Sequence, residues 1–208
     1  MFHRKILNQA DLEKIKRCVE EVEKTTSGEI VPAIVPKSDF YPGALWRIAF
    51  AFSLLFTYVF YYFIDDLPFS YYMVVEILLI PVGFLVARIP FIFRLAITSR
   101  ELEEEVYQRA LEMFHSQGVV NTRDRSGILI FVSKLERKII ILADSGINSK
   151  IPEKFWDKIV EKMVPKIKSG KLADAFCDAI EECGEQLTKN FPIKSDDQNE
   201  LPNDVVGT

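Results

Sequence analysis

The pattern of apolar and polar positions predicts a helix and then a strand within the first 40 residues. Asn8 can cap a helix whose apolar residues recur every three or four positions, and Gly28 can end it. The following run, EIVPAIVPK over 29–37, is typical of a strand, and Pro32 within it favours a sheet edge or a bulge. The expected buried stripe of the helix consists of Leu12, Ile15, Val19 and Val22.

After residue 98 the pattern predicts a helix, two strands and two further helices. The first helix, over 99–118, has its C-terminal glycine at the end of SRELEEEVYQRALEMFHSQG. Two short apolar runs, 127–133 and 138–143, read as strands, and the polar link KLER between them suits a hairpin. Amphipathic helices are then expected over 152–168 and 171–190.

Two long apolar runs, 44–64 and 71–93, interrupt this amphipathic pattern. Each is long enough to cross the hydrocarbon layer of a membrane, which takes about 20 helical residues. Pro81 and Pro90 can kink the second helix. The runs therefore predict a transmembrane hairpin, and the alternative is a large helical hairpin of a soluble protein.

The flanks of the apolar runs predict the orientation of the hairpin. The turn Asp65–Ser70 between the runs contains no Lys or Arg, whereas both outer flanks carry cations. Positively charged flanks stay in the cytoplasm, so the turn is expected on the opposite side of the membrane. The flanking cations are Lys37, Arg47, Arg88, Arg94 and Arg100.

The order of elements predicts a domain that is split by the hairpin. Residues 1–40 and 100–192 would form the domain, 41–99 the hairpin, and 193–208 a disordered polar tail. The first two strands are joined through a helix and should be parallel, while the last two should be antiparallel. With helices on both faces, the fold class is a three-layer α/β/α domain with a small mixed sheet.

Composition narrows the possible functions. The formal net charge of −4 comes without a basic stripe, so nucleic acid is not expected as a partner. The three cysteines suggest no paired framework and fit a reducing compartment. The sequence contains no P-loop, no G-x-S-x-G elbow and no H-E-x-x-H motif.

Oxygen-bearing side chains are expected to gather at one end of the sheet. Glu29 starts the first strand, Asn121 and Asp124 precede the second, and Asp144 follows the antiparallel third. Oxygen ligands from separate loops are what Ca²⁺ or Mg²⁺ requires, so these four residues are a candidate metal site. The alternative is that they are ordinary turn formers, with the carboxylates paired to neighbouring arginines.

Several segments resemble the TPM domain, a family named after plant thylakoid and photosystem II accessory proteins and a nematode receptor modulator. They are TSGEIVPAIV, the long stretch from ALEMFHSQGVVNTRDRSG to KFWDKIVEKM, and SGKLADAFCDAIEECGEQL. The resemblance is greatest to a short bacterial branch of membrane proteins, which implies a bacterial inner membrane. It implies a mixed α/β sandwich; some members are described as acid phosphatases and others as calcium binders.

The resemblance carries the same site residues. NTRDRSG supplies Asn121 and Asp124, ADSGI supplies Asp144, and the GE pair at the first strand supplies Glu29. The hairpin inside the domain departs from the commonest layout of the family, in which membrane anchors lie outside the domain.

Three functional hypotheses follow. The first is a membrane-anchored, non-enzymatic cytoplasmic module that binds a membrane or membrane-associated protein, with Ca²⁺ as the expected cation at the acidic end. The alternative is a metal-dependent phosphatase that uses Asp124 and Asp144. A third class, a small oligomeric channel component, would need Glu76 to face a helix–helix interface.

Overall fold

The structure is a computed structural model that describes residues 7–64, 66–194, 196 and 198–207. Asp65, part of the expected turn between the apolar helices, lies outside the described residues. The chain forms two compact units. The sheet unit contains the residues up to Ser38 and from Val106 onward, and the hairpin unit contains Asp39–Glu105.

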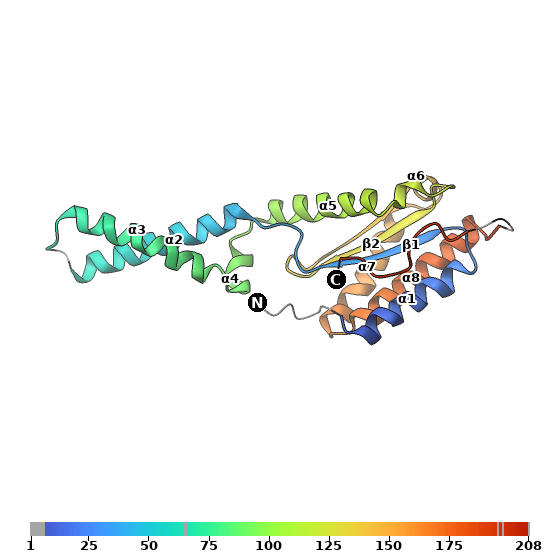
Figure 1. Ribbon diagram of the computed structural model, residues 1–208, viewed down its shortest axis with the longest axis horizontal. Coiled ribbons are helices and arrows are strands. Elements are labelled where there is room, and N and C mark those ends of the chain that lie inside the picture. The colour runs from blue at the N-terminus through green and yellow to red at the C-terminus, as the bar shows by residue number, and fades with distance from the viewer. Residues whose placement is uncertain (1–6, 65, 195, 197, 208) are drawn as a thin grey trace. The chain divides into compact units, whose positions relative to one another are not determined.

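The sheet unit is built on three strands in the order β1-β2-β3 (Figure 1). They are β1 (Glu29–Val35), β2 (Gly127–Ser133) and β3 (Lys138–Ala143). β1 pairs with β2 in parallel, and β2 pairs with β3 antiparallel. The mixed sheet expected from the sequence is therefore confirmed.

Helices cover both faces of this sheet. Helices α1 (Gln9–Glu23), α7 (Glu153–Lys168) and α8 (Leu172–Asn190) lie on one face, and α5 (Ser99–Ser116) lies on the other (Figure 1). Each face has its own hydrophobic core. Because side chains alternate along a strand, β1 sends Ile30 and Ile34 into the first core and Val31, Ala33 and Val35 into the second. This confirms the three layers.

Two of the helix signals in the sequence act as expected, whereas Gly28 does not end α1, which stops at Glu23 with Lys24 as its C-cap. The Asn8 side chain accepts a hydrogen bond from the backbone N–H of Asp11 at 2.7 Å, so it caps α1. Gly118 follows α5 with a φ of 75°, a left-handed conformation that glycine adopts at little cost. Two short elements complete the unit: the 3-10 helix η1 (Val119–Asn121) and helix α6 (Ser145–Asn148).

The hairpin unit contains α2 (Pro42–Phe63), α3 (Phe69–Val86) and the short α4 (Pro90–Leu95). The second apolar run, expected as one helix over 71–93, is thus divided. Ile89 is extended, with φ −75° and ψ 114°, because the residue before a proline is disfavoured in the helical region. Pro81, by contrast, lies inside α3.

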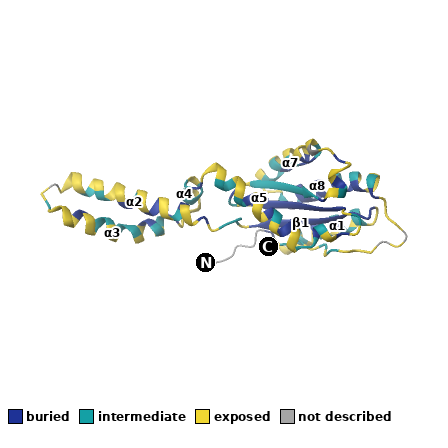
Figure 2. Cartoon of the chain, turned by 90° about the horizontal axis from the view of Figure 1, so that it is seen from above, coloured by how far each residue is buried: buried dark blue, intermediate teal, exposed yellow. Residues whose placement is uncertain are grey.

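Helices α2 and α3 pack through small residues and leave their large apolar side chains exposed. A Cβ atom on Gly83 would lie 2.6 Å from the Cα of Ala49, so the two backbones are in close contact. Side chains such as Phe63, Phe69 and Leu78 are between 67% and 77% exposed, and Figure 2 shows exposed residues along both helices. By length and composition, both helices could cross a membrane.

A capping box begins α5 and connects to α2 within the hairpin unit. The backbone N–H of Thr98 donates to the Glu101 carboxylate at 2.9 Å, and the N–H of Glu101 donates to Thr98 Oγ1 at 3.3 Å. The Arg47 guanidinium donates to both carboxylate oxygens of Glu101, at 2.7 and 2.8 Å. These hydrogen bonds, that from Arg47 above all, lower the pKa of Glu101 to about 2.

The C-terminal segment adds a short pairing to the edge of the sheet. The backbone N–H of Val206 donates to Pro32 O at 3.0 Å, and the N–H of Ile34 donates to Val206 O at 2.9 Å. The sequence favours a polar segment without structure here, whereas the structure places Val206 in a parallel bridge with Ala33. β1 is an edge strand, and an outer edge presents backbone groups that another segment can pair with.

The structure corrects the interpretation of the cysteines. Cys18 of α1 and Cys177 of α8 form a disulfide, with their Cα atoms 5.5 Å apart. The two residues are 159 positions apart in sequence, so only the packing of α1 against α8 brings them together. Cys183 is free and buried, and burial raises the pKa of its thiol, so it is not a reactive thiolate.

Candidate functional site

The register of the strands brings the predicted acidic segments to one end of the sheet. Glu29 lies opposite Gly127, and Ile128 lies opposite Ala143. Asp144, directly after β3, donates its backbone N–H to Gly127 O at 2.9 Å. The start of β1, the start of β2 and the end of β3 therefore meet at the same end.

A pair of glutamates forms the centre of this end. Glu23 is the last residue of α1, and the short turn that follows leads directly to Glu29 at the start of β1. The Ile30 N–H donates to Glu23 Oε1 at 3.1 Å. The Glu29 carboxyl and the Asn203 side chain lie close enough to the Glu23 carboxyl to affect its pKa. The end of α1 is thus held to the start of β1 through the Glu23 side chain.

The Glu23 carboxyl retains its proton at neutral pH. Burial raises its pKa, the adjacent charge of Glu29 raises it further, and together they bring it to about 8. The hydrogen bonds from the Ile30 N–H and from Asn203 oppose this shift without cancelling it. A carboxyl with a raised pKa next to a second carboxyl is a chemical arrangement that is common at functional sites and also occurs in structural networks.

The C-terminal segment closes over this pair. The backbone N–H of Glu200 donates to Glu29 Oε1 at 3.0 Å. Glu29 is only 5% exposed as a result, whereas Glu23 is partly exposed. The remaining opening is a groove of about 320 Å³. Its lining consists of Glu20, Glu23, Lys24, Thr26, Glu29, Asn199 and Asn203.

The other three predicted site residues have separate partners. Asp124 forms an ion pair with Lys194 of the C-terminal segment. Asp144 caps α6 by accepting from the Ser145 N–H at 2.6 Å, and its Oδ2 lies 3.7 Å from the Arg125 guanidinium. Asn121 is exposed at the end of η1. All four predicted residues thus lie in the segments that meet at this end, but each has its own contacts.

These contacts bear on the metal and phosphatase predictions. Among the residues that the structure describes, no group of three or more His, Cys, Asp or Glu side chains could hold a metal ion. Because Asp124 and Asp144 are engaged by different cations, the predicted set does not present converging oxygen ligands. A phosphatase that uses these two residues stays a prediction.

Sequence reasoning found Glu29 but missed Glu23, Glu200 and Asn203. Glu23 ends an amphipathic helix rich in glutamate, where an acidic residue normally faces solvent. The available signal was the short separation of Glu23 from Glu29, which keeps the end of the helix near the start of the strand. No local pattern indicates that Glu200 and Asn203, far along the chain, return to this end.

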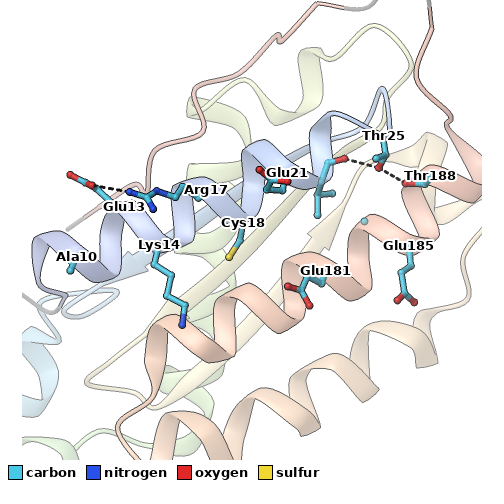
Figure 3. A pocket seen from close by; sticks show the side chains of 12 residues that line it. Ala10, Glu13, Lys14, Arg17, Cys18, Glu21, Thr25, Glu181, Glu185 and Thr188 are labelled. Carbon is cyan, nitrogen blue, oxygen red and sulfur yellow. Dashed lines mark hydrogen bonds and ion pairs between the residues drawn. The ribbon is translucent and has the colours of Figure 1, made fainter.

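A larger groove of about 900 Å³ lies between α1 and α8 and is drawn in Figure 3. Lys14 and Cys18 extend from α1 towards α8, while Glu181 and Glu185 come from α8 (Figure 3). Part of the charge in the lining is paired: Arg17 lies 3.8 Å from Glu13, and Lys14 forms an ion pair with Asp174 of α8. This groove is a mixed polar surface between two packed helices, and its chemistry points to no particular ligand.

Comparison with known proteins supports the fold. A family model described as TPM domain matches residues 94–186, which include α5, β2, β3, α7 and most of α8. The NMR structure of the BA42 protein from the psychrophilic bacterium Bizionia argentinensis sp. nov. is similar, with a TM-score of 0.63 and 23% sequence identity. The similarity covers 100% of this chain and 99% of that chain, and at this identity it shows the fold alone. None of the curated proteins matches this chain.

Proposed function

Starting from the TPM domain that this chain carries, we propose a membrane-anchored module that binds a membrane or membrane-associated protein at the acidic end of its sheet. The observation that carries the proposal is the exposed apolar surface of α2 and α3. In the most apolar 18-residue stretch of each helix, only 22% of the residues of α2 and 11% of those of α3 are buried. A helical hairpin of a soluble protein would bury one face of each helix against a core.

The dimensions of the two helices fit this role. At 1.5 Å per residue, the 22 residues of α2 extend about 33 Å and the 18 residues of α3 about 27 Å. The hydrocarbon core of a bilayer is about 30 Å thick. Exposed tyrosines near the turn between the helices match the aromatic residues that collect at a membrane interface. These are Tyr58, Tyr61, Tyr62 and Tyr71.

The anchor can be tested with a matched pair of variants of the full chain. Wild-type chain should remain in the membrane fraction after alkaline carbonate extraction. Leu54→Arg with Leu78→Arg places charges on exposed positions of α2 and α3. Inserting a charged residue near the bilayer centre costs about 3 kcal/mol, so this double variant should be released from the membrane. Tyr107→Arg with Ile193→Arg changes two exposed residues of the sheet unit and should leave the chain in the membrane fraction. Release of the wild-type chain would contradict the anchor.

For sidedness, we propose that both flanks of the hairpin and the sheet unit are cytoplasmic, in a bacterial inner membrane. The support is the cationic flanks and a turn without Lys or Arg. The Cys18–Cys177 disulfide argues the other way, because disulfides are rare in the cytosol. The flanking charges decide the orientation during membrane insertion, whereas a cysteine pair that is placed to form a disulfide can still be kept reduced in a cytosol.

Two measurements on one sample decide the sidedness. Cys introduced at Asp66 should react with a membrane-impermeant maleimide added to intact cells, because the turn would face outward. In the same cells, a cytoplasmic sheet unit would keep the Cys18–Cys177 pair reduced, so that both cysteines would react as thiols after denaturation under conditions that prevent oxidation. An unreactive Asp66→Cys together with an oxidised Cys18–Cys177 pair would place the sheet unit outside the cytoplasm.

Partner binding at the acidic end can be tested by photocrosslinking in cells. A photoreactive residue at Lys24, which is exposed beside the Glu23–Glu29 pair, should capture a discrete membrane or membrane-associated protein. The same residue at Lys154, exposed on α7, serves as the matched control. Equal crosslinking at both positions, or none at Lys24, would contradict the proposal.

A divalent cation at the Glu23–Glu29 pair is a second candidate, favoured by the two adjacent carboxyl groups and the amide of Asn203. A cation would have to displace the proton on Glu23, so Ca²⁺ affinity should increase as the pH rises through about 8. Calorimetric titration of the full chain with CaCl₂ at several pH values measures this. Glu23→Gln should abolish the binding, Glu13→Gln should not, and absence of binding above pH 8 would rule the cation out.

A further inference from the structure

The end of the sheet opposite the carboxyl pair carries a pocket of about 650 Å³. We propose that this pocket binds the head group of an anionic phospholipid, an inference that rests on the proposed membrane anchor. The pocket lies between the turn that joins β2 to β3 and the C-terminal end of α7. Three observations support this ligand: the apolar and cationic residues that line the pocket, the lack of acidic side chains among its described residues, and its position beside the segment that leads to α2.

The pocket combines an apolar floor with a cationic rim. Lys134 and Arg137 of the β2–β3 turn, Lys138 of β3 and Lys168 of α7 supply four cationic groups. A phospholipid has the complementary structure, because an anionic phosphate adjoins apolar chains. A small soluble anion would make no use of the apolar side chains. These are Ile34, Val132, Ile139, Val164, Ile167 and Leu172.

Three of the four cationic residues, Lys134, Arg137 and Lys168, meet no acidic side chain among the described residues of the pocket. No Asp or Glu is among the described residues that line it. Glu136, the acid of the turn, is fully buried and accepts hydrogen bonds from the Ser38 N–H at 2.9 Å and from the Ser133 hydroxyl. Lys134, Arg137 and Lys168 form no ion pair with any residue that the structure describes.

Two nearby lysines of α7 form ion pairs, so the lack of an ion pair between Lys168 and any described residue is not shared by every lysine of the helix. Lys162 pairs with Glu182 at 2.8 Å, and Lys166 pairs with Asp178. Both acidic partners are on α8. Lys168, only two residues further, turns to the pocket instead. The helix thus divides its lysines between ion pairs with α8 and the rim of the pocket.

The chain leaves the sheet for the first apolar helix beside this pocket. The N–H of Lys134 donates to Val35 O and the N–H of Leu135 donates to Pro36 O, both at 3.1 Å. The β2–β3 turn is therefore bonded to the segment that follows β1. Ser38 ends the sheet unit and Pro42 begins α2, and this link can span at most about 14 Å. This short link limits how far Ser38, which follows the strand end beside the pocket, can lie from the start of α2.

The experiment uses the full chain in lipid nanodiscs and follows amide hydrogen exchange by mass spectrometry. Discs of phosphatidylcholine alone are compared with discs that also contain phosphatidylglycerol. We expect exchange over 134–138 and 168–171 to slow in the anionic discs. Each basic residue near a membrane surface contributes about 1 kcal/mol, a factor of about five, so Lys134→Gln with Arg137→Gln should reduce the protection by about 25-fold, to the level in neutral discs.

The matched control is Lys154→Gln with Lys158→Gln, which removes the same charge from exposed positions of α7 away from the pocket and should leave the protection intact. Equal exchange in the two kinds of disc, or equal effects of the two double variants, would overturn the lipid site. Protection by inorganic phosphate in neutral discs would overturn it as well, in favour of a soluble anion. Wild-type chain that carbonate releases from membranes would instead overturn the anchor on which the site rests.

Discussion

The sheet unit and the hairpin unit use apolar residues in opposite ways. In the sheet unit, every residue of β1 and β2 is buried, and the apolar faces of the helices point at the strands. In α2 and α3, the small residues Ala49 and Gly83 bring the two backbones into contact, and many of the large apolar side chains are exposed. Figure 2 shows the exposed positions along both helices. Apolar content alone therefore does not define a core, because these two helices are highly apolar and yet bury few of their large side chains.

The largest expected difference between the units comes from one substitution made in each. Phe131→Ala removes a fully buried ring from β2 and should lower the free energy of unfolding by about 3–5 kcal/mol. Phe69→Ala removes a ring that is 76% exposed and should change it by less than about 0.5 kcal/mol. Urea unfolding of the full chain in mild detergent, followed by circular dichroism, measures both. Equal losses would mean that Phe69 is buried against protein.

The close contact within the hairpin unit is tested by Gly83→Ala. The added Cβ would meet the backbone of Ala49, so the helices must separate, at a cost of about 1–3 kcal/mol. Trp46 of α2 reports the change, because its ring lies 4.9 Å from that of Phe84 in α3. In a chain that also carries Trp156→Phe, Trp46 is the only tryptophan, and its fluorescence emission should shift on Gly83→Ala. The hairpin should also unfold at a lower dodecyl sulfate concentration.

Val82→Ala, at a more exposed position beside Gly83, is the control and should leave the emission of Trp46 unchanged. If Gly83→Ala and Val82→Ala behave alike, the two helices are not packed through Gly83.

Within the sheet unit, the carboxyl pair should make stability depend on pH. The pKa of Glu23 is raised from 4.5 to about 8 in the folded chain, so the folded state binds more protons than the unfolded state between these values. The stabilisation is complete below pH 4.5 and is lost as the pH rises through 8, by at most about 1.4 kcal/mol per pH unit. Glu23→Gln should flatten this profile in urea unfolding measured across the same range.

Glu13→Gln, on the exposed surface of the same helix, is the control and should leave the slope in place. A wild-type profile that rises between pH 4.5 and 8 would show that the pair does not hold a proton.

The most local expected effect is that of the C-terminal pairing. Truncation after Asp204 removes Val206 and with it two backbone hydrogen bonds to β1, each worth about 1 kcal/mol net. Exchange of the Ile34 amide should become faster, while that of Leu129, in the central strand, should not. Val206→Ala keeps the backbone pairing and should behave as wild type. Unchanged exchange at Ile34 after truncation would mean that the segment does not pair in solution.

Much of the fold could be predicted because its signals are local. The bounds of β2 and β3 match the predicted runs, and Asn8 caps α1 as expected. The order of elements also predicted the parallel and antiparallel pairings, since connection rules leave few alternatives for three strands. The break at Ile89 had a local signal in Pro90, although its effect on the helix was larger than a kink.

The candidate site could be predicted only in part. Glu29 was identified because a strand start has a known place in the sheet, and the expected meeting of three segments follows from the register. Whether Asp124 and Asp144 face each other or separate cations depends on the positions of Lys194 and Arg125. Such side-chain pairings have no periodicity along the chain.

The sequence by itself determined most of the elements, their order and the two long apolar runs. Periodicity and run length record which side of each helix or strand leaves water, and that is a local property. Only the tertiary structure decided that Cys18 meets Cys177, that the carboxyl groups of Glu23 and Glu29 lie close together, and that Val206 returns to β1. These contacts join segments whose relative positions are set by packing across the whole unit, so no short stretch of sequence encodes them.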